Sequence, residues 1–232
     1  MTRNIEFLSG GKKIAAEIFE PAKMPSRGAI VIAYGSDGFV DNEHGPWKTT
    51  IYGFASDLAG EGFTVIIPDY FQRTNTRPGD IDFRNGGAQQ IWLHRDEWQA
   101  TLADALKHAA GLAGGTPARL GLLGFSLGGY LCSKIRAGAG GLVEFFAPAL
   151  DGIGPSGGSS LHAQIHHGLG DTLVPFALNA PRIEQELRTS GATTELCKYE
   201  GATHGFASAD PADVKARQLS KERTVAFFAA HL

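Results

Sequence analysis

Two kinds of apolar pattern run along the chain and predict two kinds of strand. Residues 5–8 and 13–19 alternate apolar and polar positions on either side of Gly10 and Gly11, which predicts an antiparallel hairpin with one face in water. Further along, short runs are apolar at nearly every position, as is typical of parallel strands covered on both faces. These runs span residues 28–34, 63–68, 120–125 and 142–146, and two more strands are predicted over 163–167 and 194–199.

Between these strands, apolar positions recur at the spacing of a helix. Ile51, Phe54 and Leu58 follow one another at intervals of three and four residues before Gly60, so they predict one face of a helix. Similar patterns predict helices over residues 92–112, 127–136, 179–190 and 213–232. Because strand and helix alternate from residue 28 onward, the pattern favours an α/β fold. We expect a doubly wound, mostly parallel sheet in one domain over residues 1–232.

Composition narrows the class of protein. A chain of 232 residues buries enough surface to fold without disulfides or metals, and two cysteines exclude a disulfide scaffold or a Cys-based zinc site. The formal net charge of −3 gives no electrostatic basis for binding nucleic acid or an anionic membrane. The sequence has neither an 18-residue apolar run nor the apolar stretch of a signal peptide near Met1. We therefore expect a cytoplasmic protein that does not enter the membrane.

The segment Gly124-Phe125-Ser126-Leu127-Gly128 carries the strongest chemical signal. It fits G-x-S-x-G and lies between a predicted strand and a predicted helix, as a nucleophile elbow requires. In such an elbow a strained turn lifts the serine hydroxyl above the sheet, and the flanking glycines leave room for the turn. The same turn aims the N–H of Leu127 toward a developing oxyanion. Ser126 is therefore the candidate nucleophile.

A serine nucleophile needs a histidine as base and a carboxylate that orients the histidine. In this fold the acid and then the base follow the serine along the chain. His204 lies in a loop of small residues after the strand predicted at 194–199, and we predict that it is the base. Asp171 follows the strand at 163–167 and is predicted as the acid. Asp151 is the alternative, because the acid can lie one strand earlier.

Three segments together resemble the dienelactone hydrolase family of α/β-hydrolases. They are residues 124–129 (Gly-Phe-Ser-Leu-Gly-Gly), 167–175 (His-Gly-Leu-Gly-Asp-Thr-Leu-Val-Pro) and 199–206 (Tyr-Glu-Gly-Ala-Thr-His-Gly-Phe). The resemblance implies an enzyme that hydrolyses an ester or a lactone without a cofactor. It also implies a triad of Ser126, Asp171 and His204, with the N–H of Ser36 joining that of Leu127 as an oxyanion donor.

Two positions depart from the pattern of that family. Its best-known members use a cysteine nucleophile where this chain has Ser126, and they place a glutamate after the third strand where this chain has Gly35. The two differences agree with each other, because a carboxylate that acts on a thiol has no use beside a serine. The resemblance therefore implies a serine esterase. A thioesterase or acyltransferase on the same triad, and a ligand-binding protein without turnover, remain as alternatives.

The remaining candidates concern the substrate. Gly35 and His44 lie in the loop after the strand at 28–34, over the strand ends where ligands bind in such sheets. Trp47, Phe71 and Trp92 are candidates for an aromatic wall, and Trp92 fits a core position of a helix equally well. Acidic residues and His44 share this loop, but their spacing fits no metal motif, so no metal is predicted. No phosphate-binding glycine motif follows a strand, so no nucleotide cofactor is expected. The expected partner is a small-molecule ester or lactone, and the oligomeric state is left open.

Overall fold

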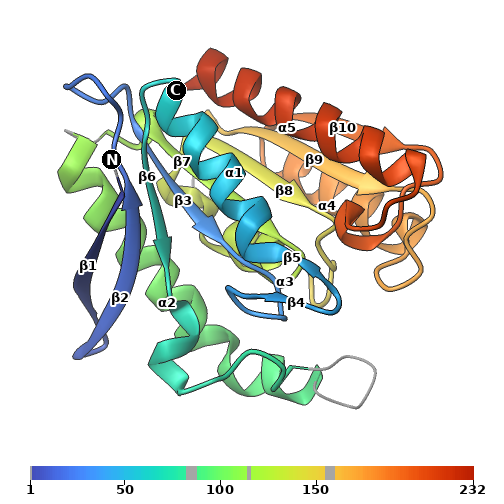
Figure 1. Ribbon diagram of the computed structural model, residues 1–232, viewed down its shortest axis with the longest axis horizontal. Helices are drawn as coiled ribbons and strands as arrows, with labels where there is room; N and C mark the ends of the chain where they lie inside the picture. The colour runs from blue at the N-terminus through green and yellow to red at the C-terminus, as the bar shows by residue number, and fades with distance from the viewer. Residues whose placement is uncertain (1, 82–87, 114–115, 155–159) are drawn as a thin grey trace.

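One large sheet organises the molecule (Figure 1). The computed structural model describes residues 2–81, 88–113, 116–154 and 160–232. Within them, eight strands are ordered β1-β2-β6-β3-β7-β8-β9-β10. Their bounds are β1 Thr2–Ser9, β2 Lys12–Phe19, β3 Ala29–Ala33, β6 Thr64–Pro68, β7 Leu120–Phe125, β8 Gly141–Phe145, β9 His162–Gly168 and β10 Thr193–Tyr199.

Strand direction follows the sequence pattern closely. The alternating strands β1 and β2 pair antiparallel, and β2 pairs antiparallel with β6. From β6 to β10 every neighbouring pair is parallel. The prediction of a mostly parallel α/β sheet with an N-terminal hairpin is confirmed, and the described chain forms one domain around this sheet.

Helices cover both faces of the sheet, which explains why its central strands are apolar throughout. In Figure 1, α1 (Trp47–Gly60) and α5 (Pro211–His231) lie across one face. The helices α2 (Ala88–Ala113), α3 (Leu127–Ile135) and α4 (Phe176–Thr189) lie on the other. Every residue of β3, β6, β7 and β8 is buried. No helix among the described residues is both long and apolar enough to cross a bilayer.

Some boundaries differ from those the periodicity predicted. The helix α2 begins four residues before the predicted start at 92, and α4 begins at Phe176 rather than at residue 179. The short pair β4 (Asp41–Asn42) and β5 (Gly45–Pro46) was not predicted, because two-residue strands are too short to produce an alternating pattern. Cys132 and Cys197 are free and buried, as small core residues should be.

Beside β3, the chain reverses the direction in which it adds strands to the sheet. The chain runs from β3 to β6 on one side, then crosses back to β7 on the other side of β3. In open parallel sheets, ligands bind at such a point, outside the carboxyl ends of the strands. The loops that follow β3 and β7 therefore meet where a site is expected.

Candidate active site

Ser126 occupies a strained turn between β7 and α3. Its backbone angles are φ +51° and ψ −116°, a region that residues other than glycine rarely adopt. A Cβ on Gly124 would lie 2.5 Å from the carbonyl oxygen of Gly128, and a Cβ on Gly128 would overlap the carbonyl oxygen of Ala33. The two glycines of the motif are thus required by close backbone approach, and the turn that they permit raises Ser126 at the end of the sheet.

Ser126, His204 and Asp171 form a continuous hydrogen-bonded series. His204 begins a short 3₁₀ turn, His204–Phe206, after β10, and its Nε2 lies 3.2 Å from Ser126 Oγ. Its Nδ1 lies 2.7 Å from Asp171 Oδ2. Asp171 follows β9, so the ends of the parallel strands β7, β9 and β10 bring together residues that are up to 78 positions apart. The series has the order and geometry of a nucleophile, a base and an orienting acid.

The carboxylate of Asp171 is held ionised by its surroundings. Its side chain is fully buried, and its Oδ1 accepts hydrogen bonds from the backbone N–H groups of Leu173 and Val174 at 3.0 and 2.8 Å. Burial acts to raise the pKa of Asp171, but hydrogen bonds from His167 and His204 outweigh burial and lower it to about 2. A permanent negative charge therefore faces Nδ1 of His204.

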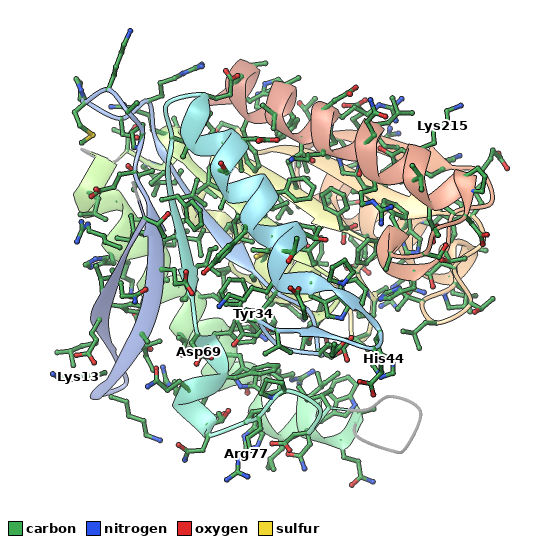
Figure 2. The ribbon with its side chains drawn as sticks, viewed as in Figure 1. Lys13, Tyr34, His44, Asp69, Arg77 and Lys215 are labelled. Carbon is green, nitrogen blue, oxygen red and sulfur yellow. The ribbon has the colours of Figure 1, made fainter. Side chains whose placement is uncertain are left out.

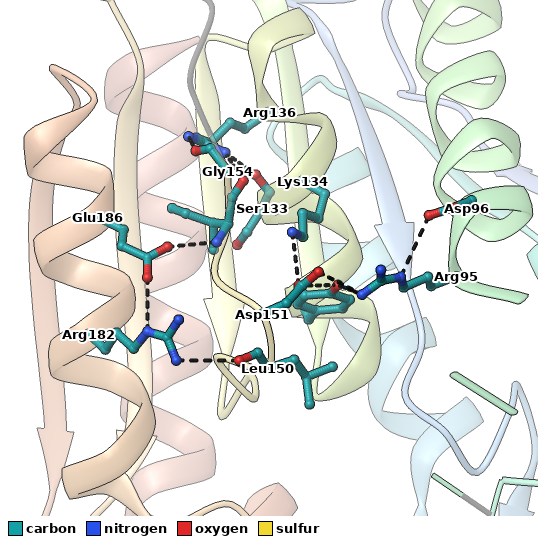
Figure 3. Close-up of polar contacts among 12 residues, drawn as sticks. Arg95, Asp96, Ser133, Lys134, Arg136, Leu150, Asp151, Gly154, Arg182 and Glu186 are labelled. Atoms are coloured by element: carbon teal, nitrogen blue, oxygen red, sulfur yellow. Dashed lines mark hydrogen bonds and ion pairs between the residues drawn. The ribbon is translucent and has the colours of Figure 1, made fainter. Parts of the chain in front are cut away.

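Asp151, the alternative acid, lies in a different cluster (Figure 3). It accepts hydrogen bonds from Tyr130 Oη at 2.7 Å and Arg95 at 2.6 Å, and it pairs with Lys134 at 2.9 Å. These groups fasten the loop after β8 to α2 and α3. The structure brings Asp171 to His204, and it brings Asp151 to three other side chains.

The two predicted oxyanion donors, Leu127 and Ser36, lie on segments next to Ser126. Leu127 is the first residue of α3, so its N–H has no acceptor within the helix. Ser36 lines the same pocket as Ser126. The loop that carries Ser36 is anchored by Tyr34, whose hydroxyl donates to Asp69 Oδ1 at 2.8 Å and so ties the ends of β3 and β6 together (Figure 2). Leu127 therefore follows Ser126 directly in the chain and Ser36 shares its pocket, while their role as oxyanion donors stays a prediction.

Gly35 lies directly against Ser126. A Cβ at this position would be 3.5 Å from Ser126 Cβ, in ordinary contact. Any side chain at residue 35 would therefore touch Ser126, and glycine keeps that space open.

A narrow, mainly aromatic pocket of about 60 Å³ opens beside Ser126 and His204. Its polar members include Ser36, Thr50 and Arg217. Trp92, which the sequence suggested for an aromatic wall, is half exposed on α2 and does not line this pocket. The rings of the pocket come from β7, β8, α1 and the loops that follow the strands, and only Trp47 among them was predicted from the sequence. These rings are Trp47, Phe54, Phe125, Phe145, Phe146 and Phe206. Because aromatic residues in apolar strands also serve as core, no local signal separates the two roles.

The other two predicted substrate residues lie elsewhere. Phe71 is buried against Tyr34 and Trp98, and it does not line the pocket beside Ser126. The short helix Tyr70–Thr74 turns its ring into the core. His44, near the β4–β5 turn (Figure 2), lines an outer depression that it shares with Ser36 and His204. Across the described ranges, no group of three or more His, Cys, Asp or Glu residues could hold a metal ion.

Comparison with known proteins identifies the relatives of this chain. The model of the dienelactone hydrolase family matches residues 14–232. No curated protein matches the sequence significantly. Many solved structures share the fold at low identity.

Three of these structures match over nearly their whole length. A candidate dienelactone hydrolase from Klebsiella pneumoniae is 20% identical, covering 99% of this chain and 98% of that one, with a TM-score of 0.73. A dienelactone hydrolase-like promiscuous phosphotriesterase from metagenomic libraries is 18% identical, covering 100% and 98%, with a TM-score of 0.75. Esterase 2 of Thermogutta terrifontis, phosphonylated by cyclosarin, is 19% identical, covering 97% and 94%, with a TM-score of 0.67.

Proposed function

This chain belongs to the dienelactone hydrolase family, and we propose that it is a serine hydrolase that cleaves small carboxylic esters or lactones. The observation that carries this proposal is the unbroken series from Ser126 Oγ through His204 to Asp171, with contacts of 3.2 and 2.7 Å. Each group has the neighbour that its role needs. The strained turn at Ser126 supports the same reading, because such strain persists only where the fold maintains it.

In the proposed reaction, Ser126 attacks the carbonyl carbon of the substrate. His204 Nε2 accepts the hydroxyl proton as the Ser126 Oγ–carbon bond forms. The carbonyl oxygen gains negative charge, which the N–H groups of Leu127 and Ser36 stabilise. The resulting imidazolium of His204 is stabilised by the ionised carboxylate of Asp171.

The second half of the reaction releases both products. His204 returns its proton to the leaving alcohol oxygen, and the bond between that oxygen and the carbonyl carbon breaks. An acyl-enzyme on Ser126 remains. Water then attacks the acyl carbon while His204 takes a proton from it, and the acid leaves as Ser126 regains its hydrogen. Atoms and charge balance without a metal or an organic cofactor.

The pocket supports a substrate with a compact apolar acyl group. Its aromatic lining favours burial of apolar surface, and its narrow volume of about 60 Å³ disfavours long chains. Gly35 supports a serine mechanism in particular. A serine is activated by His204 at the moment of attack and needs no neighbouring carboxylate to control a standing thiolate.

Turnover of p-nitrophenyl acetate, butyrate and octanoate, together with a γ- and a δ-lactone, tests the proposal. We expect the short esters to be hydrolysed faster than octanoate, and Ser126→Ala to reduce every rate by about 10⁶-fold. Preference for acyl thioesters, or transfer to an added alcohol in place of hydrolysis, would replace the ester hydrolase with a thioesterase or acyltransferase. Binding of these compounds without turnover by the wild type would indicate a binding protein.

A further inference from the structure

A buried carboxyl group without a partner lies beneath the nucleophile elbow. Glu144 is in the middle of β8 and is fully buried. Among the described residues, neither of its side-chain oxygens has a hydrogen-bond partner. Burial raises the pKa of Glu144 to about 7, against the smaller opposing effects of His167 and of the Ala147 amide. An unsatisfied buried carboxyl costs stability, so its presence in the core calls for a physical reason.

A second unpartnered atom lies on the adjacent strand. His167 is fully buried on β9, and its Nε2 is 2.8 Å from the carbonyl oxygen of Val174. A carbonyl only accepts, so Nε2 carries a proton, and in the neutral ring Nδ1 is then an acceptor. Nδ1 has no hydrogen-bond partner among the described residues. A protonated Glu144 offers a donor without an acceptor, and His167 offers an acceptor without a donor.

Glu144 and His167 project from the same face of the sheet. Glu144 pairs with Ile165 across β8 and β9, so His167, two residues further along β9, projects from the same face. On that face lies α3, where a Cβ on Gly129 would come within 3.3 Å of Glu144 Oε2. The last glycine of Gly-Phe-Ser-Leu-Gly-Gly therefore leaves room for the carboxyl group.

His167 connects this layer to the triad. Its Nε2 lies 3.4 Å from Asp171 Oδ2, the same oxygen that faces Nδ1 of His204 at 2.7 Å. Asp171 is therefore held between two histidines, one that faces Ser126 and one that faces the buried layer of Glu144. We propose that Glu144 and His167 form a buried pair that holds one exchangeable proton behind Asp171 and thereby controls the strength of the triad.

The proton balance of the pair is simple. When Glu144 transfers its proton, the O–H bond breaks and an N–H bond forms at His167 Nδ1, so the pair changes from two neutral groups to an ion pair. Glu144 and His167 share no direct hydrogen bond, so the transfer requires a bridging water, for which Glu144, His167 and the Ala147 amide would be the polar partners. Loss of that proton to solvent leaves one negative charge behind Asp171, which stabilises the imidazolium that His204 forms during attack.

Few other titratable groups face the pair. On α3, the thiol of Cys132 lies near Glu144, and burial raises its pKa so that it stays neutral. Asp171 faces the pair from the loop after β9, and the α4 side of His167 is covered by the ring of Phe176. On the opposite face of β9, His166 is kept neutral by burial, which lowers its pKa to about 3. Of the groups named in this layer, Glu144 is therefore the one whose pKa is raised into the neutral range.

The first test is the pH dependence of kcat/KM for a p-nitrophenyl ester. We expect two ionisations on the acid side for the wild type, and only one for Glu144→Gln, with a plateau roughly three- to tenfold lower. In a His167→Gln background, Glu144→Gln should change the profile less than twofold. Cys132→Ala, which alters packing beside Glu144 without removing the carboxyl group, should retain both ionisations. Two ionisations in Glu144→Gln, or an equal effect of this substitution in both backgrounds, would overturn the proposal.

The second test does not depend on activity. The raised pKa of Glu144 means that its contribution to stability is present below about pH 4.5, its unperturbed value, and is lost as pH rises through about 7. Urea unfolding should therefore show the wild type losing stability relative to Glu144→Gln across this range. A constant difference would overturn the pair.

This inference rests on the proposed serine hydrolase, yet the two can fail separately. If Ser126→Ala retains full activity, the proposed function fails, while the urea experiment still tests whether Glu144 titrates. If Ser126→Ala is inactive and Glu144→Gln keeps both the wild-type profile and a constant stability difference, only the buried pair fails.

Discussion

Two aspartates with the same electrostatic character lie in opposite settings in this molecule. The pKa of Asp171 and that of Asp151 are each lowered to about 2, in both cases against the opposing effect of burial. Asp171 has a fully buried side chain bound by two histidines and two backbone amides. The side chain of Asp151 is 35% exposed and is bound by an arginine, a lysine and a tyrosine.

The difference shows that a lowered pKa does not identify a catalytic acid. An arginine or lysine beside a carboxylate stays protonated, so it cannot accept a proton from a further group. A histidine has a second ring nitrogen, so while one nitrogen donates to the carboxylate the other can accept a proton from a further group. Of the two aspartates, only Asp171 has such a donor that reaches Ser126. The groups that bind the carboxylate, more than its charge state, therefore distinguish the aspartate of the candidate active site from the one that stabilises the fold.

The largest effect should come from removing the hydroxyl of Ser126, the group at the end of the hydrogen-bonded series that starts at Asp171. Ser126→Ala should lower kcat for p-nitrophenyl butyrate by about 10⁶-fold, because triad members act as a unit. Circular dichroism should match the wild type, since the serine side chain makes no other essential contact. Residual turnover above one per cent of wild type in a folded variant would mean that another group performs the attack.

Asp171→Asn comes next. The amide cannot stabilise an imidazolium and favours the wrong tautomer of His204, so kcat should fall by about 10⁴-fold. The measurement is kcat on the same ester. If this variant retained a tenth of the wild-type rate while Asp151→Asn did not, the assignment of the two regions would have to be exchanged.

Acid stability should separate the same two regions. Because the pKa of Asp171 is depressed, its contribution is present above about pH 3.8 and is lost as pH falls toward 2. The wild type should lose about 2 kcal/mol relative to Asp171→Asn across that interval, as measured by urea unfolding at each pH. Parallel curves for the two proteins would show that the carboxylate of Asp171 is not stabilised by its surroundings.

Asp151→Asn should affect stability and leave the chemistry intact. Its ion pairs are partly exposed and therefore contribute modestly, so the free energy of unfolding should fall by about 1 kcal/mol. The kcat/KM value should stay within about threefold of wild type. A hundredfold loss of kcat/KM with an unchanged melting temperature would place Asp151 in the site.

The smallest effect is expected from thiol alkylation. Burial raises the pKa of Cys197 to about 12 and that of Cys132 still higher, so neither forms a thiolate at neutral pH. Iodoacetamide should leave esterase activity unchanged, with mass spectrometry to report any modification. Inactivation traced to either cysteine in a folded protein would revive a thiol mechanism.

Much of the candidate site could be predicted from the sequence, because its geometry requires particular residue types at particular positions in the chain. Gly124 and Gly128 are both needed because the backbone approaches closely around Ser126. This requirement produces the recognisable G-x-S-x-G motif. Asp171 and His204 were found because parallel strands end at one edge of the sheet, so residues just after different strands meet. The strand pattern predicted the sheet for a similar reason, since burial on both faces leaves little choice of residue.

The features that the sequence did not yield depend on side-chain direction. Phe71 follows a strand end as Asp171 does, but the 3₁₀ turn that contains it points its ring into the core. Phe145 and Phe146 belong to an apolar run in either role, and only the packing places them at the pocket. Glu144 did leave a signal, namely a charged residue inside a strand that is otherwise apolar, but its partner His167 is 23 residues away and was visible only once β8 and β9 were paired.

The most direct test of the central claim is the covalent capture of the nucleophile. The wild type should be treated with a fluorophosphonate probe at neutral pH, digested and mapped by mass spectrometry, with Ser126→Ala, Asp171→Asn and Asp151→Asn treated in parallel. The account predicts one adduct on Ser126 in the wild type, none in Ser126→Ala, and much slower labelling in Asp171→Asn, whereas Asp151→Asn should label at the wild-type rate. Labelling at another residue, or equal labelling rates for Asp171→Asn and the wild type, would contradict the account.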